Sequence, residues 1–99
     1  MQIMTMNFSR SQDIIERDFQ GESVLLDLNT GLYFSLNSVG SFVWRLLDGS
    51  RTARDIAEHL SANYDVDPDT AARDTEELIR DLLDQRLIQT AASAEANNL

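Results

Sequence analysis

Residues 22–37 read ESVLLDLNTGLYFSLN, two runs of alternating side chains with a turn between them. The first run divides into two faces, whose members are Val24, Leu26 and Leu28 on one side and Ser23, Leu25 and Asp27 on the other. Gly31 suits the left-handed position of a three-residue loop over residues 29–31. The pattern therefore predicts an antiparallel hairpin made of strands 22–28 and 32–36.

The second strand of this hairpin, residues 32–36, is apolar along its whole length. Leu32, Phe34 and Leu36 share one face, and we expect Phe34 and Leu36 to form part of the core. Tyr33 and Ser35 share the opposite face, where the Tyr33 ring either braces the sheet or contacts a partner. Because the strand has neither charge nor proline to protect it at a sheet edge, an added peptide strand could pair with it.

Further strands and helices are predicted before and after this hairpin in the sequence. Residues 12–19 form a third strand, and 87–89 add a short strand at the other end. A helix over 38–47 is capped by Asn37 or Ser38 and stopped at Gly49. A second helix, over 53–63, begins at a Thr52 capping box, and a third, over 68–86, begins with the cap Asp67 followed by Pro68. We expect an α+β, winged-helix-like fold in which a three-stranded antiparallel sheet is followed by three helices. Residues 1–11 are predicted to be a flexible, irregular lead-in, 12–89 the domain, and 90–99 a flexible tail.

The helix over 68–86 has an apolar sector wider than one packing surface requires. One stripe is an ordinary core face, made of Ala71, Thr75, Leu78 and Leu82. A second stripe contains Ala72, Ile79 and Leu83, and Glu76 and Arg80 border it. Two interpretations stay open: the helix packs against two elements, or the second stripe is the wall of a groove.

Composition excludes several classes of function. The 99-residue chain has a net charge of −9, its eight basic residues are all Arg, and it contains no Lys or Cys. Nucleic-acid binding depends on clustered positive charge, so this balance argues against it. The sequence contains no apolar run long enough to span a membrane and no signal peptide, and a cytoplasmic location is expected.

No catalytic or metal-binding constellation can be recognised. The serines lack an evident base, and His59 is the only histidine. Asp65, Asp67, Asp69 and Glu76 have part of the spacing of a calcium loop, but helix capping explains them better. We therefore expect no enzyme activity, no cofactor and no metal.

Two segments together resemble a known family. They are VLLDLNTGLYFSLNSVGSFVWRLLDG, residues 24–49, and TARDIAEHLSANYDVDPDTAARDTEELIRDLLDQRLI, residues 52–88. The chain is similar over residues 22–88 to the PqqD-like family, the RiPP recognition elements that bind precursor peptides. The part YDVDPDTAARD, residues 64–74, most resembles the discrete recognition protein of lasso-peptide clusters.

This resemblance implies a non-catalytic adaptor. The leader of a ribosomally synthesised precursor would add as an antiparallel strand to residues 32–36, in a groove closed by helix 68–86. The peptide-binding residues implied in this way are Leu32, Tyr33, Phe34, Ser35, Leu36, Ala72, Glu76, Ile79, Arg80 and Leu83. The adaptor would present the leader to a partner enzyme, in lasso systems a leader peptidase.

Other interpretations remain open at this point. A winged-helix nucleic-acid-binding protein would share the fold, but helix 68–86 carries more acidic than basic residues. A PqqD-like chaperone for a radical SAM peptide-modifying enzyme would share the binding mode. The chain is expected to be a monomer or a strand-exchanged dimer, and a structural dimer would pair the edge strand with its own copy.

Overall fold

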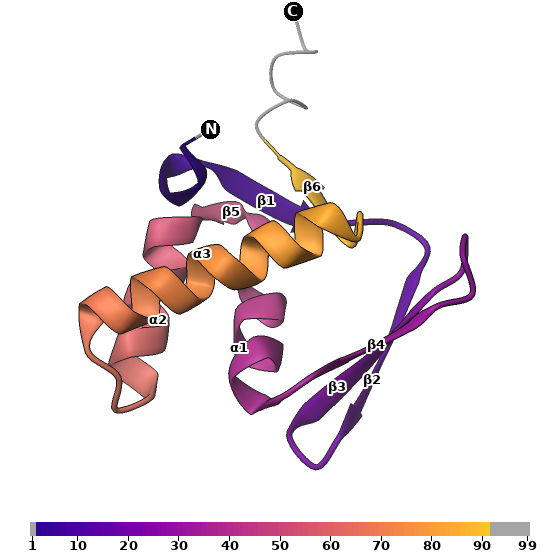
Figure 1. The fold of residues 1–99 in the computed structure, drawn as a ribbon, viewed down its shortest axis with the longest axis horizontal. Coiled ribbons are helices and arrows are strands. Elements are labelled where there is room, and N and C mark those ends of the chain that lie inside the picture. Colours follow the sequence, from indigo (N-terminus) through magenta and orange to yellow (C-terminus); the bar gives the residue numbers. More distant parts are fainter. Residues whose placement is uncertain (1, 92–99) are drawn as a thin grey trace, which may run out of the picture.

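The computed structural model describes residues 2–91, which form two small antiparallel sheets and three α-helices (Figure 1). The elements in chain order are η1 (Ile3–Thr5), β1 (Asn7–Arg10), β2 (Ile14–Phe19), β3 (Glu22–Asp27), β4 (Tyr33–Leu36), α1 (Ser38–Leu46), β5 (Asp48–Thr52), α2 (Ala53–Asn63), α3 (Pro68–Asp84) and β6 (Ile88–Thr90). The α+β class and the three helices are as predicted. The sequence indicated one sheet, whereas the structure has two.

The predicted three-stranded sheet is present, with the strand order β2-β3-β4. In the β3–β4 ladder Leu25 lies opposite Phe34, and Leu26 lies opposite Tyr33. Gln20 and Gly21, with φ of 55° and 84°, form the two-residue turn from β2 to β3. Between β3 and β4, Gly31 has φ of 76° as expected, but the loop covers residues 28–32 and is two residues longer than predicted.

The face of β3 that is buried is the less hydrophobic of the two. Ser23, Leu25 and Asp27 are buried, while Val24 and Leu26 are only half-buried on the other face. Partners satisfy the polar groups: the Ser23 hydroxyl donates to the Asp18 carboxylate over 2.9 Å. The Asp27 carboxylate accepts the backbone N–H of Asn29 over 2.8 Å. A buried polar residue with such a partner costs little, so the alternation alone does not fix which face is inside.

The predicted irregular lead-in is wrong for residues 3–10, which form η1 and β1. Phe8 is fully buried and Ile3 is 2% exposed. β1 is the central strand of the second sheet, whose order is β5-β1-β6. Strand β5 was also missed, because its sequence DGSRT is polar and its Gly49 was interpreted only as a helix stop. Both strands exist through pairing between segments far apart in the chain.

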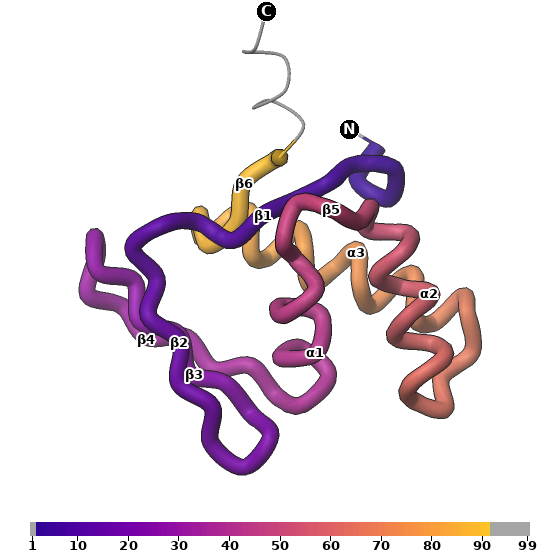
Figure 2. The backbone as a smooth tube through the Cα atoms, turned by 180° about the vertical axis from the view of Figure 1, so that it is seen from behind, coloured from indigo at the N-terminus to yellow at the C-terminus, as the bar shows by residue number. Residues whose placement is uncertain are grey.

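Helix α1 joins the two sheets and fixes the end of β4 (Figure 2). The Asn37 side chain caps α1 by accepting the N–H of Gly40 over 2.8 Å, which decides between the two predicted caps, Asn37 and Ser38. The Ser41 hydroxyl then donates to the carbonyl of Leu36, the last residue of β4, over 3.3 Å. These contacts hold the strand and the helix in one fixed junction.

Helix α3 packs against α2, η1 and β6. It begins with the predicted Asp67 cap and Pro68, and it ends at Asp84, two residues earlier than expected. Its buried residues are Ala71, Thr75, Ile79 and Leu82. The helix thus uses the stripe of residues 71, 75, 79 and 82 for the core, and its neighbouring flank turns toward β4.

Candidate functional site

Strand β4 lies at an edge of the β2-β3-β4 sheet and pairs with β3 alone among the described strands. Its sequence YFSL contains no charged residue and no proline. The opposite edge of the sheet is β2, where Glu16, Arg17 and Asp18 are consecutive. Charged residues protect a sheet edge from added strands, so the two edges of this sheet differ, and β4 is the one open to pairing.

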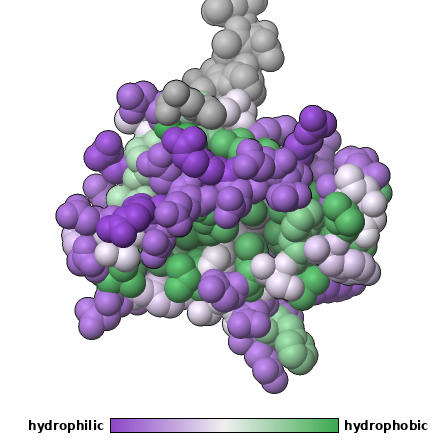
Figure 3. Space-filling view, viewed as in Figure 1, coloured by the Kyte–Doolittle hydropathy of each residue, from purple (hydrophilic) through white to green (hydrophobic). Residues whose placement is uncertain are grey.

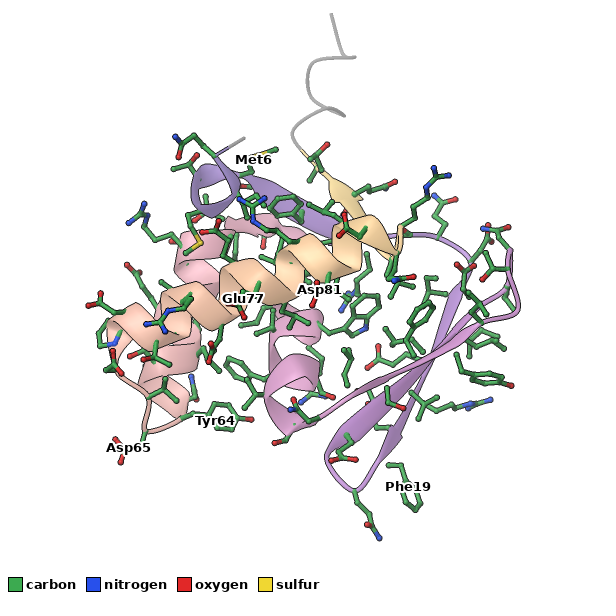
Figure 4. All side chains as sticks on the ribbon, viewed as in Figure 1. Met6, Phe19, Tyr64, Asp65, Glu77 and Asp81 are labelled. Carbon is green, nitrogen blue, oxygen red and sulfur yellow. The ribbon has the colours of Figure 1, made fainter. Side chains whose placement is uncertain are left out.

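A groove of about 410 Å³ lies between β4 and the C-terminal half of α3. Its walls are Tyr33, Phe34, Ser35 and Leu36 from β4, Leu78, Asp81, Leu82 and Gln85 from α3, and Leu87. Asp81 is the one charged residue among them, and it lies on the side of α3 that faces α1 and the sheet (Figure 4). Hydrophobic residues gather beneath α3 in the surface view (Figure 3). The site is a channel with an apolar floor of Phe34, Leu78 and Leu82, polar side chains at its rim, and a backbone edge on one side.

The strand residues named in the sequence analysis lie at the groove, with one exception. All four residues of β4 line the groove, so Tyr33, Phe34, Ser35 and Leu36 lie where the sequence placed them. Leu36 is 8% exposed and Phe34 packs against the core, which confirms their inward face. Leu32 precedes the strand and is 55% exposed instead of packing with them.

The predicted helix residues do not come together at this groove. Ile79 is fully buried in the core, so in this structure it offers no accessible wall to the groove. Ala72 lines a different hollow, and Leu83 packs half-buried against the core. Glu76 and Arg80 form an ion pair, with 2.9 Å between Oε2 and Nη2, and neither lines the groove.

The α3 residues that do line the groove are Leu78, Asp81, Leu82 and Gln85. Leu78 and Leu82 belong to the stripe that was predicted to face the core. Helical periodicity does show that 78, 81, 82 and 85 share one flank. It does not show which flank meets β4, because that depends on where α2 and β6 pack. The interpretation that α3 packs against two elements is the better description of its core residues.

A second hollow of about 430 Å³ lies where η1, α2 and the start of α3 meet. Met4, Ala57 and Ala72 give it apolar walls, and Arg54 and Asp69 are at its rim. None of its lining residues belongs to a strand, and it lies at the end of the molecule away from the β2-β3-β4 sheet (Figure 1).

Within residues 2–91, no group of three or more His, Cys, Asp or Glu could hold a metal ion. The carboxylates whose pKa is lowered, Asp48 and Asp67, act in local turns and caps outside the groove. No described helix is both long and apolar enough to cross a membrane.

The fold and this site define a small α+β domain with an open sheet edge bordered by a helix. A family model described as "Coenzyme PQQ synthesis protein D (PqqD)" matches residues 22–88, more than half of the chain. The chain belongs to this PqqD family, the RiPP recognition elements, as the sequence motifs indicated.

Two solved structures resemble the chain closely. One, "TbiB1 in Complex with the TbiA(beta) Leader Peptide", is 34% identical, with a TM-score of 0.75 over 82% of this chain and 94% of that chain. The other, "Lasso peptide synthetase B1 complexed with the leader peptide", is 25% identical, with a TM-score of 0.75 over 84% of this chain and 98% of that chain. No curated protein matches the sequence.

Proposed function

We propose that this protein is a non-catalytic adaptor that binds the leader region of a ribosomally synthesised precursor peptide and delivers it to a separate processing enzyme. The observation that carries the proposal is the open edge of β4 facing the apolar flank of α3 across the groove. Both similar structures are complexes with leader peptides, and one is a lasso peptide synthetase B1. A lasso-type leader peptidase is therefore the partner that we propose.

The leader would bind as a fourth strand, antiparallel to β4. A strand of four residues offers the backbone groups of two residues at its free edge, so about four hydrogen bonds can form. At about 0.5–1.5 kcal/mol each, they give about 2–6 kcal/mol. A micromolar complex requires about 8 kcal/mol, and ordering the leader adds a further cost. Backbone pairing alone is therefore too weak.

Apolar anchors supply the remaining affinity and the sequence preference. Side chains on the inner face of the added strand would enter the groove between Phe34 and the α3 residues Leu78 and Leu82. Burying one Leu-sized or Phe-sized anchor contributes about 1.5–3 kcal/mol, so two anchors are enough. Asp81 gives this wall a single negative charge, so the leader residue opposite it is expected to be neutral or basic.

Hydrogen exchange tests the binding mode directly. The probe is a synthetic leader peptide from a candidate precursor, which we expect to be encoded near the gene for this chain. Its addition should slow amide exchange in residues 33–36 at the β4 edge and leave the charged β2 edge, residues 14–19, unchanged. Protection at β2 and not at β4 would contradict strand addition at this site.

A matched pair of variants tests the groove wall. Leu78→Asp should weaken leader binding in a polarisation assay by at least about tenfold, because it places a charge against the anchors. Ala72→Asp adds the same charge to the same helix but at the other hollow, so it should change affinity by no more than about twofold. Leu78→Ala is the milder variant if the first does not fold. Equal losses for the two Asp variants would show that the groove is misplaced.

A further inference from the structure

The two walls of the groove belong to different parts of the domain. β4 lies in the β2-β3-β4 sheet, which packs mainly against α1, whereas α3 packs mainly against α2, η1 and β6. Figure 1 shows this sheet set to one side of α3. The chain connects the sheet to the rest of the domain at residues 11–13, before β2, and at Asn37, after β4. The contacts at these two connections therefore bear on how far β4 lies from α3.

The end of α3 is a strained turn. Arg86 has φ of 60°, in the left-handed region that is unfavourable for a residue with a side chain. Its N–H donates to the carbonyl of Leu83 over 3.0 Å, and the Leu87 N–H donates to the carbonyl of Leu82 over 2.9 Å. This pair of bonds is the Schellman ending of a helix, in which glycine is the usual residue at the left-handed position. Gln85 and Leu87 line the groove, so this turn shapes one end of it.

Ser11 holds this turn to the segment that enters the sheet. Its backbone N–H donates to the carbonyl of Leu87 over 2.9 Å, and its hydroxyl donates to the carbonyl of Arg86 over 2.9 Å. Two residues further on, the carbonyl of Asp13 accepts the N–H of Leu28 over 2.9 Å. Leu28 begins the loop that leads into β4. A series of hydrogen bonds and short chain segments thus runs from the α3 wall of the groove to the β4 wall.

Positive φ values mark both ends of this link. Asp13 has φ of 65°, close to the value at Arg86. Within residues 2–91, the third residue other than glycine with a positive φ is Gln20, in the β2–β3 turn, where a two-residue hairpin requires it. Such a conformation persists only where the surrounding contacts hold it. The bonds of Ser11 lie between the two strained residues of the link and are among those contacts.

We propose that Ser11 is a positioning residue for leader recognition, an inference that rests on the proposed function. By joining the end of α3 to the segment that enters the sheet, Ser11 sets the width of the groove beside Gln85 and Leu87. Ser11 itself does not line the groove. Without its hydroxyl bond the two walls would move more freely, and a smaller share of the molecules would have the groove width that the leader requires.

Loss of the hydroxyl should have a measurable but limited effect. A neutral hydrogen bond of this kind changes an equilibrium by about two- to tenfold. We therefore expect Ser11→Ala to weaken leader binding by at least about threefold. The N–H bond to Leu87 remains in this variant and should keep it folded. Ser11→Thr retains the hydroxyl and should bind leader within about twofold of wild type.

Ser61 offers a matched control. Its hydroxyl donates to the carbonyl of Val66 over 2.8 Å, where α2 leads into α3, and it lines the hollow at the other end of the molecule. Ser61→Ala therefore removes the same kind of bond, from a serine hydroxyl to a backbone carbonyl, without touching the groove. If Ser11 only stabilised the fold, Ser11→Ala and Ser61→Ala would both lower the melting temperature and leave leader affinity unchanged.

A distance measurement separates positioning from stability. The chain contains no Cys, so two introduced cysteines can be spin-labelled without competition. Suitable changes are Thr30→Cys, in the loop before β4, and Asp84→Cys, at the end of α3; both positions are exposed and neither lines the groove. In the free protein, Ser11→Ala should broaden the distribution of distances between the labels, and the synthetic leader peptide should narrow it again. Ser11→Thr and Ser61→Ala should keep the wild-type distribution.

The outcomes separate this role from the proposed function. A Ser11→Ala protein that melts at a lower temperature but keeps the wild-type distances and leader affinity would overturn the positioning role. Broader distances with unchanged affinity would also overturn it, because leader binding would then not depend on the position of the walls. A wild-type chain that binds no leader refutes the proposed function. In that case broader distances in Ser11→Ala still support its hold on the two walls, and unchanged distances refute that as well.

Discussion

The indole N–H of Trp44 donates a hydrogen bond of 2.9 Å to a carboxylate oxygen of Glu16, which joins α1 to β2 beneath the sheet. Trp44 is 1% exposed, and Glu16 lies opposite Leu25 on the inner face of the sheet. A buried indole N–H requires an acceptor, and here the sheet provides it. The contact helps to fix the sheet that carries β4 relative to the helices that carry the other wall of the groove.

Removing that acceptor should destabilise the whole domain. Glu16→Ala leaves the Trp44 N–H buried without a partner, and we expect a loss of about 1–3 kcal/mol in the free energy of unfolding, measured with urea. Glu16→Gln keeps an oxygen at the same distance and should lose less than about 1 kcal/mol. Equal stability of Glu16→Ala and wild type would mean that water replaces the carboxylate at no cost.

Ile79 should matter for stability and not for peptide recognition. Because it is fully buried, Ile79→Ala creates a cavity and should cost about 2–5 kcal/mol in urea unfolding. Leader affinity, measured under conditions where the variant is fully folded, should stay within about twofold of wild type. Asp81→Ala, two residues further along α3 and at the groove, is the control whose stability should change little, since Asp81 is exposed. A folded Ile79→Ala protein that binds leader much more weakly would restore Ile79 to the binding site.

The parts of the fold that could be predicted from the sequence are those specified by residues close together in the chain. Alternation and Gly31 specify the hairpin, and the side chains of Asn37, Thr52 and Asp67 cap their helices as predicted. Strand β1 escaped notice because NFSR holds one apolar residue, Phe8, and is stabilised by pairing with β5 and β6. Such pairing joins segments that no local pattern connects.

The candidate site was predicted on its strand side and missed on its helix side for a similar reason. Residues 33–36 form an edge because of their own composition, which a sequence displays. The helix flank depends on rotation: the same apolar sector would present Ile79 or Leu78 to β4, according to where the remaining core packs. The wide apolar sector of α3 showed in the sequence that the helix has two contact surfaces. The positions of α2 and β6 decide which stripe packs in the core and which faces β4.

Two glycines near β4 should respond to alanine in opposite directions. Gly31 has φ of 76°, and a Cβ there would meet no atom within 4 Å, so Gly31→Ala should cost about 1 kcal/mol from backbone strain alone. Gly40 lies in the first turn of α1, and its added Cβ would lie 3.4 Å from both the Leu36 side chain and the Asn37 Oδ1 that caps the helix, at the near limit of ordinary contact. Gly40→Ala should therefore be neutral or stabilise by up to about 1 kcal/mol in thermal melts. Destabilisation of both variants by the same amount would contradict this distinction.

Asp48 organises the start of β5 through its two carboxylate oxygens. One oxygen accepts the Ser50 hydroxyl over 2.6 Å and the Ser50 backbone N–H over 3.0 Å. The other accepts an Arg51 guanidinium N–H over 3.0 Å. These bonds, those from Ser50 above all, favour the ionised form and lower the pKa of Asp48 from 3.8 to about 2.

This lowered pKa predicts an acid-dependent share of stability. The folded state holds the Asp48 proton less tightly than the unfolded chain, so the stabilisation is fully present above pH 3.8 and is lost as pH falls toward about 2. Because the side chain is 40% exposed, solvent limits the effect to less than about 1 kcal/mol. Asp48→Asn should lower the urea midpoint at pH 7, and the difference from wild type should shrink as pH falls from 4 to about 2. A difference that stays constant across this range would show that Asp48 acts through its shape and not its charge.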